Sequence, residues 1–113
     1  MQHDPRAWLW DVRQAADAIA AFVQGRSLAD YIADLMLRSA AERQFEIAGE
    51  ALNRLSREAP ELATLRRAIA MRNARIRGYR EVDKATVWLT VHDDLPGLRA
   101  QVAALLAELG DQP

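Results

Sequence analysis

Residues 5–24 read PRAWLWDVRQAADAIAAFVQ, and the apolar positions of this stretch decide the class of fold. They follow alternating spacings of four and three, which is the pattern of a helix that packs one face against a core; they are Trp8, Val12, Ala15, Ile19 and Phe22. Gly25 is placed to end this helix, because glycine commonly follows the last helical residue. The stretch therefore predicts a first helix over about residues 5–24.

Two further helices are predicted from the next part of the chain. Ser27 and Asp30 have the spacing of a capping box, which opens a long helix over about residues 28–58. Pro60 ends that helix, and a third is predicted over about residues 61–77. The apolar stripe of the second helix consists of Tyr31, Leu35, Phe45, Ala48, Leu52 and Leu55.

The last third of the chain predicts one short and one longer helix. Gly78 stops the third helix, and Asp83 can cap a short helix that contains Val87, Trp88 and Val91. Asp94-Leu95-Pro96 is expected to interrupt that helix and to start the last one, because proline is tolerated in the first turn of a helix and not in its interior. The sequence thus predicts an all-α protein, an up-down bundle of four main helices plus one short helix.

Composition limits the function classes. The 113 residues are half apolar, so residues 1–113 are expected to form a single domain with its own core. The sequence contains no cysteine, which excludes disulfides and thiolate sites. No apolar run approaches the about 20 residues of a membrane span, and the first residues lack a signal-peptide pattern. We therefore expect a cytoplasmic protein without a membrane partner.

The basic residues are unevenly distributed. The net charge is −1, and Lys84 is the only lysine among 15 basic residues. Residues 62–80 contain no Asp or Glu but carry six arginines: Arg66, Arg67, Arg72, Arg75, Arg77 and Arg80. Such a local excess of one charge indicates an anionic partner or a strongly solvated face.

Arg72 occupies an unusual position in the predicted third helix. It falls on that helix's apolar stripe, which Tyr79 continues. A buried guanidinium is costly unless it is paired with an acid or bound to an anion. Glu46 or Glu50 of the second helix are possible acidic partners, and a bound phosphate is the alternative.

The neighbouring side chains also have two interpretations. Arg75, Arg77 and Arg80 are compatible with a solvated face as well as with a nucleic-acid site, and Tyr79 is compatible with an ordinary core aromatic. On a straight helix Arg72 and residue 77 point about 140° apart, so they line one cavity only if the helix bends or a second chain closes the site. Neither His3 nor His92 has metal-ligand spacing, and no metal or cofactor is predicted.

The motif itself resembles that of a known family. The residues from Arg72-Asn73 to Tyr79 are similar to the Arg-Asn-x-x-x-His-x-Tyr signature of HepT-like HEPN proteins. Three further blocks resemble the family in order: Trp8-Leu9-Trp10-Asp11, the segment AAERQFEIAGEA at residues 40–51, and the run from Val82-Asp83 through Val87-Trp88 to Asp94-Leu95-Pro96-x-Leu98. The resemblance therefore covers nearly the whole chain.

The resemblance implies a fold, an activity and partners. It implies a HEPN-like helical homodimer whose interface cleft binds RNA, and a toxin of a type II toxin–antitoxin system with a minimal nucleotidyltransferase as its antitoxin. Active members resemble metal-independent endoribonucleases without a cofactor. By the resemblance, Arg72 and Tyr79 are catalytic, Asn73, Arg75 and Arg80 bind RNA phosphates, and Tyr79 is also the acceptor of AMP from the antitoxin.

The sequence departs from the family at the histidine, whose position Arg77 occupies. Arginine has no lone pair and stays protonated, so it cannot act as a general base. We therefore predict weak or absent RNA cleavage, with anion binding retained. A non-catalytic interaction or nucleotide-binding partner of a nucleotidyltransferase is the alternative. A one-base codon change converts His to Arg, so natural divergence and selection against a toxic chain both account for Arg77.

Overall fold

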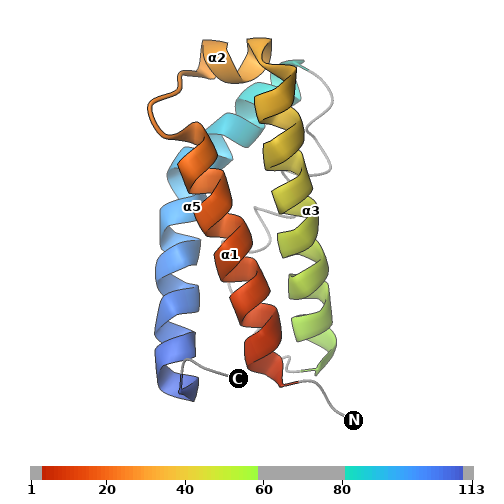
Figure 1. Ribbon diagram of the computed structural model, residues 1–113, viewed down its shortest axis with the longest axis vertical. Coiled ribbons are helices and arrows are strands. Elements are labelled where there is room, and N and C mark those ends of the chain that lie inside the picture. Colours follow the sequence, from red (N-terminus) through yellow and green to blue (C-terminus); the bar gives the residue numbers. More distant parts are fainter. Residues whose placement is uncertain (1–3, 59–80, 111–113) are drawn as a thin grey trace.

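The computed structural model describes residues 4–58 and 81–110 of the chain. These residues form three long helices, α1 (Pro5–Val23), α3 (Leu35–Glu58) and α5 (Glu81–Leu109), and one short helix, α2 (Leu28–Ala33) (Figure 1). No strand occurs among the described residues. The all-α prediction is confirmed, and the helix predicted over about residues 61–77 lies outside the described residues.

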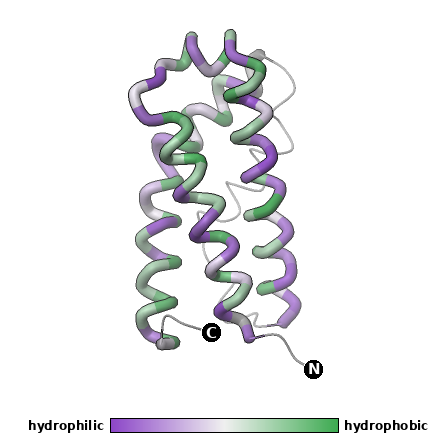
Figure 2. Tube along the Cα trace, in the orientation of Figure 1, coloured by the Kyte–Doolittle hydropathy of each residue, from purple (hydrophilic) through white to green (hydrophobic). Residues whose placement is uncertain are grey.

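Helix α1 lies between the other two long helices. It runs antiparallel to α3 and α5, which flank it, and α2 crosses the end of the bundle at which α3 begins (Figure 1). Helix α1 packs against both α3 and α5, and α2 also contacts both. Hydrophobic and hydrophilic residues alternate along each helix (Figure 2), so each can turn an apolar stripe toward a shared core.

Helix α1 begins and ends as the sequence predicts. The Asp4 carboxylate accepts a hydrogen bond from the main-chain N–H of Arg6 at 3.0 Å, and Pro5 is the first helical residue. Gly25, just beyond the helix, has a φ of +73°, which favours glycine. The residues that α1 buries are Leu9, Val12, Ala15, Ala16, Ile19 and Val23, with Trp8 and Phe22 packed partly buried at the edges.

The prediction of one long helix over residues 28–58 is wrong in one respect, because the helix is interrupted at Asp34. The capping box of Ser27 and Asp30 is present, but α2 ends after one and a half turns. Asp34 is extended, and its carboxylate accepts from the main-chain N–H of Leu37 at 3.1 Å, which caps the start of α3. Arg38 then donates to the carbonyls of Tyr31 and Ile32 at the end of α2. These side chains satisfy main-chain groups that a continuous helix would have paired internally.

The break shifts the apolar stripe. Leu35, predicted in the core, is 68% exposed, whereas Leu37 is buried. The remaining predicted positions of the stripe are buried as expected: Tyr31, Phe45, Ala48, Leu52 and Leu55. The register changed because Asp34 interrupts the rotation of 100° per residue on which the prediction depended.

The predicted interruption at Asp94-Leu95-Pro96 is also wrong, because α5 continues through Pro96. Proline in a helix interior removes one hydrogen bond and clashes with the preceding turn, at a cost of about 3 kcal/mol. Burial of apolar side chains before and after Pro96 offsets this cost. One stripe of α5 is buried along its length: Val87, Val91, Leu95, Leu98, Val102 and Leu106. Helix α5 changes direction along its length (Figure 1), as expected of a helix that contains proline.

Candidate functional site

The residues that the sequence singled out all lie outside the described part of the chain. They are Arg72, Asn73, Arg75, Arg77, Tyr79 and Arg80. The structure therefore neither brings them together nor separates them, and their roles stay predictions. The described residues do contain one surface with concentrated polar chemistry, on α3 where it faces away from the core and along its contact with α1.

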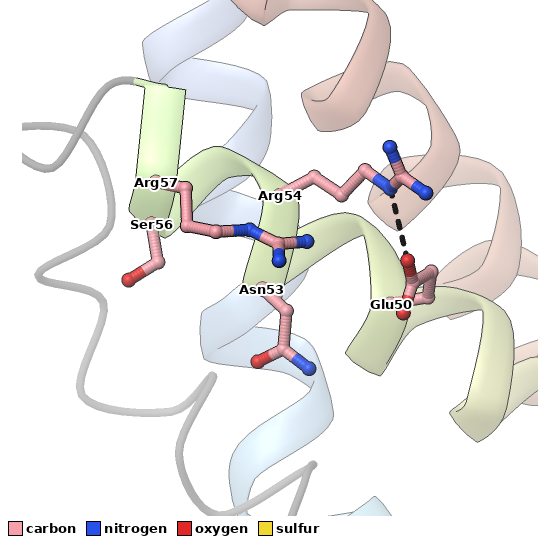
Figure 3. A pocket seen from close by; sticks show the side chains of 5 residues that line it. All are labelled: Glu50, Asn53, Arg54, Ser56 and Arg57. Atoms are coloured by element: carbon pink, nitrogen blue, oxygen red, sulfur yellow. Dashed lines mark hydrogen bonds and ion pairs between the residues drawn. The ribbon is translucent and has the colours of Figure 1, made fainter.

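Five residues of α3 line a pocket of about 540 Å³, which we call the α3 pocket: Glu50, Asn53, Arg54, Ser56 and Arg57. Helical spacing brings them together, since residues three, four and seven positions apart share one face. Figure 3 shows Arg54 and Arg57 extending from neighbouring positions toward the Glu50 side of the pocket. The α3 pocket thus presents two guanidinium groups, an amide and a hydroxyl, all of which can bind an anion.

One of the two arginines in the α3 pocket is held by neighbours. Arg54 Nε lies 2.9 Å from Glu50 Oε1, and its guanidinium stacks 5.4 Å from the centre of the Trp8 ring on α1. The Trp8 indole N–H in turn donates to the Glu58 carboxylate. These contacts fix Arg54 and connect the end of α3 to the start of α1.

A second pocket adjoins the first at Glu50. It has a volume of about 220 Å³ and lies between α1 and α3; its lining residues are Trp8, Asp11, Arg43, Glu46, Ile47, Glu50 and Ala51. Arg43 pairs with Glu46 at 3.3 Å. Among its described lining residues three carboxylates outnumber the one guanidinium, so these side chains repel anions.

The predicted acidic partners of Arg72 each have a partner on their own helix. Glu46 pairs with Arg43, and Glu50 pairs with Arg54. Both pairs are exposed, and such pairs contribute about 0–1 kcal/mol. A carboxylate can accept more than one hydrogen bond, so the predicted pairing with Arg72 is not decided by these contacts.

A different group of titratable residues lies where α2, α3 and α5 meet. Tyr31 is fully buried against Trp88, with the ring centres 5.5 Å apart. Burial, with a smaller effect of the Glu42 charge, raises the pKa of Tyr31 to about 12. Burial also raises the pKa of Glu42, against the opposing effect of Arg38 and Lys84. These shifts are typical of groups inside a packed protein and do not require a ligand.

His92 is exposed and lies inside α5. Its Nδ1–H donates to the main-chain carbonyl of Trp88 at 3.0 Å, and its ring stacks on Trp88 with 4.4 Å between centres. Within residues 4–58 and 81–110, no group of three His, Cys, Asp or Glu side chains is placed to hold a metal ion. None of the described helices is long and apolar enough to cross a membrane.

Comparison with known proteins identifies the class of protein. The chain matches the family model described as "Ribonuclease HepT-like" over residues 12–105. A Thermococcus cleftensis protein named "Probable ribonuclease HepT" is 30% identical over 109 residues, which cover 93% of this chain and 98% of the relative. A Methanocaldococcus jannaschii protein that is named as an RNase is 28% identical over 104 residues, 89% of this chain and 95% of the relative. Both relatives are thus named as ribonucleases.

The particular family follows from these matches: the chain belongs to the HepT-like ribonuclease family, as the resemblance predicted. The matched residues 12–105 include the whole segment from Arg72 to Arg80. They also include α3, so the α3 pocket lies in the part of the chain that the family shares. No solved structure matches the chain significantly.

Sequence reasoning did not select the residues of the α3 pocket. Arg54 and Arg57 were not distinguished from other surface arginines, because their importance depends on which arginines already have partners. The one local signal was the spacing of Glu50, Asn53, Arg54 and Arg57, which places four polar side chains on one face of a helix. The same spacing is common on solvated helix surfaces.

Proposed function

We propose that this protein is the toxin component of a type II toxin–antitoxin system, that RNA is its ligand, and that it cleaves RNA weakly or not at all as its sequence stands. The observation that carries the proposal is the family match over residues 12–105, within which Arg77 stands at the histidine position of the motif. By the family's pattern, Arg72 stabilises the charge on the phosphoryl oxygens. Asn73, Arg75 and Arg80 hold neighbouring phosphates.

The chemistry of residue 77 decides the turnover. In metal-independent cleavage a base takes the proton from the ribose 2′-hydroxyl, whose oxygen attacks the adjacent phosphate, and the 5′-oxygen of the next nucleotide leaves. General acid–base catalysis of this kind contributes about 10²–10⁴ in rate. A neutral imidazole can accept the proton, whereas a guanidinium has no lone pair for it. Arg77 therefore retains phosphate attraction while removing the base.

The proposal includes two partners. A second copy of the chain forms a two-fold homodimer and supplies the other wall of the cleft. This is one of the two ways, with a bend of the helix, in which Arg72 and residue 77 can line one cavity. A minimal nucleotidyltransferase acts as the antitoxin by attaching AMP to the Tyr79 hydroxyl. The added phosphate introduces negative charge beside the arginines and blocks the approach of RNA.

The Arg77→His variant tests the proposed activity, with Arg77→Gln as the matched control. Both changes remove the guanidinium, but only histidine supplies a base. We expect Arg77→His to cleave single-stranded RNA about 10²–10⁴ times faster than the original chain, with Arg77→Gln inactive. A folded Arg77→His variant that neither cleaves RNA nor slows growth contradicts the toxin function.

One observation favours a second candidate function, a non-catalytic partner of a nucleotidyltransferase. Arg77 itself keeps the anion site charged while it removes turnover, which suits a protein that binds a nucleotide or a partner and does not cleave. In that case Arg77→His stays inactive, and the chain forms a complex with the nucleotidyltransferase. Light scattering distinguishes the homodimer from a monomer. Mass spectrometry after incubation with ATP and the nucleotidyltransferase tests the AMP acceptor, since the original chain should gain the mass of AMP and Tyr79→Phe should not.

A further inference from the structure

We propose that the α3 pocket is a second phosphate-binding site, separate in sequence from residues 72–80, which holds a phosphodiester group of a single-stranded RNA through Arg57. This inference rests on the proposed function, because it takes RNA as the ligand. It adds a binding residue that the family motif does not include. The site lies on the outer face of α3, where RNA has access from solvent.

Arg57 differs from every other arginine that the structure describes. Five of the others form ion pairs, with Asp4, Asp34, Glu46, Glu50 or Asp17. Arg38 donates to main-chain carbonyls, and Arg13 lies 5.0 Å from the Trp10 ring. Arg57 alone among the described arginines has no hydrogen bond, ion pair or ring contact. An exposed guanidinium with all five donors available in a pocket is suited to bidentate phosphate binding.

The charges of the two adjoining pockets indicate which one receives the anion. The described lining residues of the α3 pocket include two arginines and one glutamate, which together carry a net charge of +1. The described lining residues of the pocket between α1 and α3 include three acids and one arginine, a net charge of −2. An approaching phosphate is therefore attracted to Arg57 and repelled from the neighbouring pocket.

The remaining lining residues match a phosphodiester. Asn53 and Ser56 lie four and one positions before Arg57 and carry groups that donate to phosphate oxygens. Arg54 is three positions from Arg57, so their β-carbons are about 5–6 Å apart and both guanidinium groups can reach one phosphate. Glu50 holds Arg54 at 2.9 Å, which leaves Arg57 as the principal contact.

A purely structural role for Arg57 has a different signature. Arg57 is the basic residue in the last turn of α3, where a cation interacts favourably with the C-terminal end of the helix dipole. That role affects thermal stability and has no effect on RNA. A phosphate contact instead changes the salt dependence of RNA binding, because each neutralised phosphate releases counterions.

The experiment measures the affinity of a fluorescently labelled single-stranded RNA by anisotropy over a series of KCl concentrations. Arg57→Gln is expected to bind about three- to tenfold more weakly, and its slope of log K against log salt is expected to fall by about 0.7 for each α3 pocket that the RNA occupies. Arg26→Gln, which removes the same charge near α2 at the other end of the bundle, is expected to leave both values unchanged.

Glu50→Gln provides a test in the opposite direction. It removes the only acid among the described residues of the α3 pocket and releases Arg54 from its ion pair, so RNA binding is expected to become stronger. Thermal unfolding followed by circular dichroism checks that each variant is folded at the temperature of the binding measurement. Arg57→Gln and Glu50→Gln change the charge of the α3 pocket in opposite directions, so opposite effects on RNA affinity assign those effects to this charge.

The possible outcomes separate this inference from the proposed function. If the original chain binds RNA and Arg57→Gln binds it with the same affinity and salt slope, the α3 pocket is not a phosphate site, while the proposed function stands. If neither the original chain nor Arg77→His binds RNA, the proposed function fails and this inference is overturned with it. A weaker Arg57→Gln with a reduced slope, together with a stronger Glu50→Gln, establishes the site.

Discussion

Arg6, in the first turn of α1, donates a hydrogen bond from Nη1 to the main-chain carbonyl of Leu109, the last residue of α5, at 3.0 Å. The same guanidinium pairs with Asp4, at 2.6 Å between Nη2 and Oδ2. The last carbonyls of a helix have no partner within the helix. Arg6 therefore satisfies one of them and ties the first helix of the chain to the last.

Arg6→Ala is expected to lower the Tm by a few degrees, because it leaves the Leu109 carbonyl and the Asp4 carboxylate without this partner. In the original protein, the hydrogen bond between the Arg6 side chain and the Asp4 carboxylate holds the pKa of Asp4 below the ordinary 3.8. This contribution is complete above pH 3.8 and is lost as the pH falls through the lowered pKa, so the Tm difference between the two proteins should shrink in acid. Arg26→Ala is the control, and an equal loss of Tm in both variants contradicts the role of Arg6.

Tyr31→Phe is expected to retain or raise stability at pH 7. The Tyr31 hydroxyl is buried without a hydrogen-bond partner in the structure, so its removal relieves a desolvation cost. The pKa of Tyr31 is about 12 in the folded protein and 10.0 ordinarily. Because the folded state keeps the proton, stability falls by about 1.4 kcal/mol for each pH unit between 10 and about 12. Urea unfolding between pH 9 and 11 should show that the free energy of unfolding falls less in Tyr31→Phe than in the original protein. Equal losses in the two proteins would contradict the raised pKa of Tyr31.

Pro96→Ala is expected to stabilise the protein. Pro96 is exposed in the interior of α5, where proline costs about 3 kcal/mol. Its rigidity lowers the entropy of the unfolded chain by the equivalent of about 0.4–1 kcal/mol, which leaves a gain of about 2 kcal/mol for alanine. Urea unfolding measures the change. An unchanged or lower stability would show that the packing of α5 requires the bend.

Asp34→Ala is expected to lower the free energy of unfolding by about 1 kcal/mol. The Asp34 carboxylate accepts from the main-chain N–H of Leu37 and caps α3, and alanine leaves that donor without its partner. Asp93→Ala, at an exposed position on α5, removes the same charge without removing a cap and serves as the control. A loss of similar size in both variants would assign the effect to charge and not to capping.

The Arg77→His variant is also expected to show a pH dependence that the original chain lacks. A histidine base acts in its neutral form and has an ordinary pKa of about 6.5. Cleavage of RNA by Arg77→His should therefore increase through this pH and level off above it. The measurement is the single-turnover rate between pH 5 and 8. A rate that does not change with pH in this range would mean that residue 77 is not the base.

The parts of the fold that depend on nearby residues could be predicted from the sequence. The start and end of α1 and the capping box of α2 depend on residues within one turn, and they are present as predicted. The family could also be predicted from the sequence, because the blocks that resemble it occur in order along the chain, and the family match over residues 12–105 confirms it. The candidate residues between Arg72 and Arg80 follow from the local excess of arginine, the position of Arg72 on the predicted stripe and the resemblance.

The break at Asp34 and the continuity of α5 could not be predicted in this way. Helical propensity favours continuing from Leu28 through Leu35, but Arg38 and the Asp34 carboxylate satisfy the main-chain groups at the break and shift the buried stripe to Leu37. Pro96 would end an isolated helix, yet the apolar residues on both sides bury themselves against α1 and α2. In both cases contacts between helices exceed the local preference.

The sequence by itself determined the all-α class and the family, because these follow from residue identity and spacing. It also predicts that a general base is missing, since Arg77 stands where the family resemblance implies a histidine. Only the tertiary structure decided which arginine among residues 4–58 and 81–110 has no partner. That property depends on where every other charged side chain lies, and it distinguishes Arg57 in the α3 pocket from Arg54, which Glu50 and Trp8 hold in place. Residue identities fix what each group can do chemically, whereas packing fixes which of them remain available to a ligand.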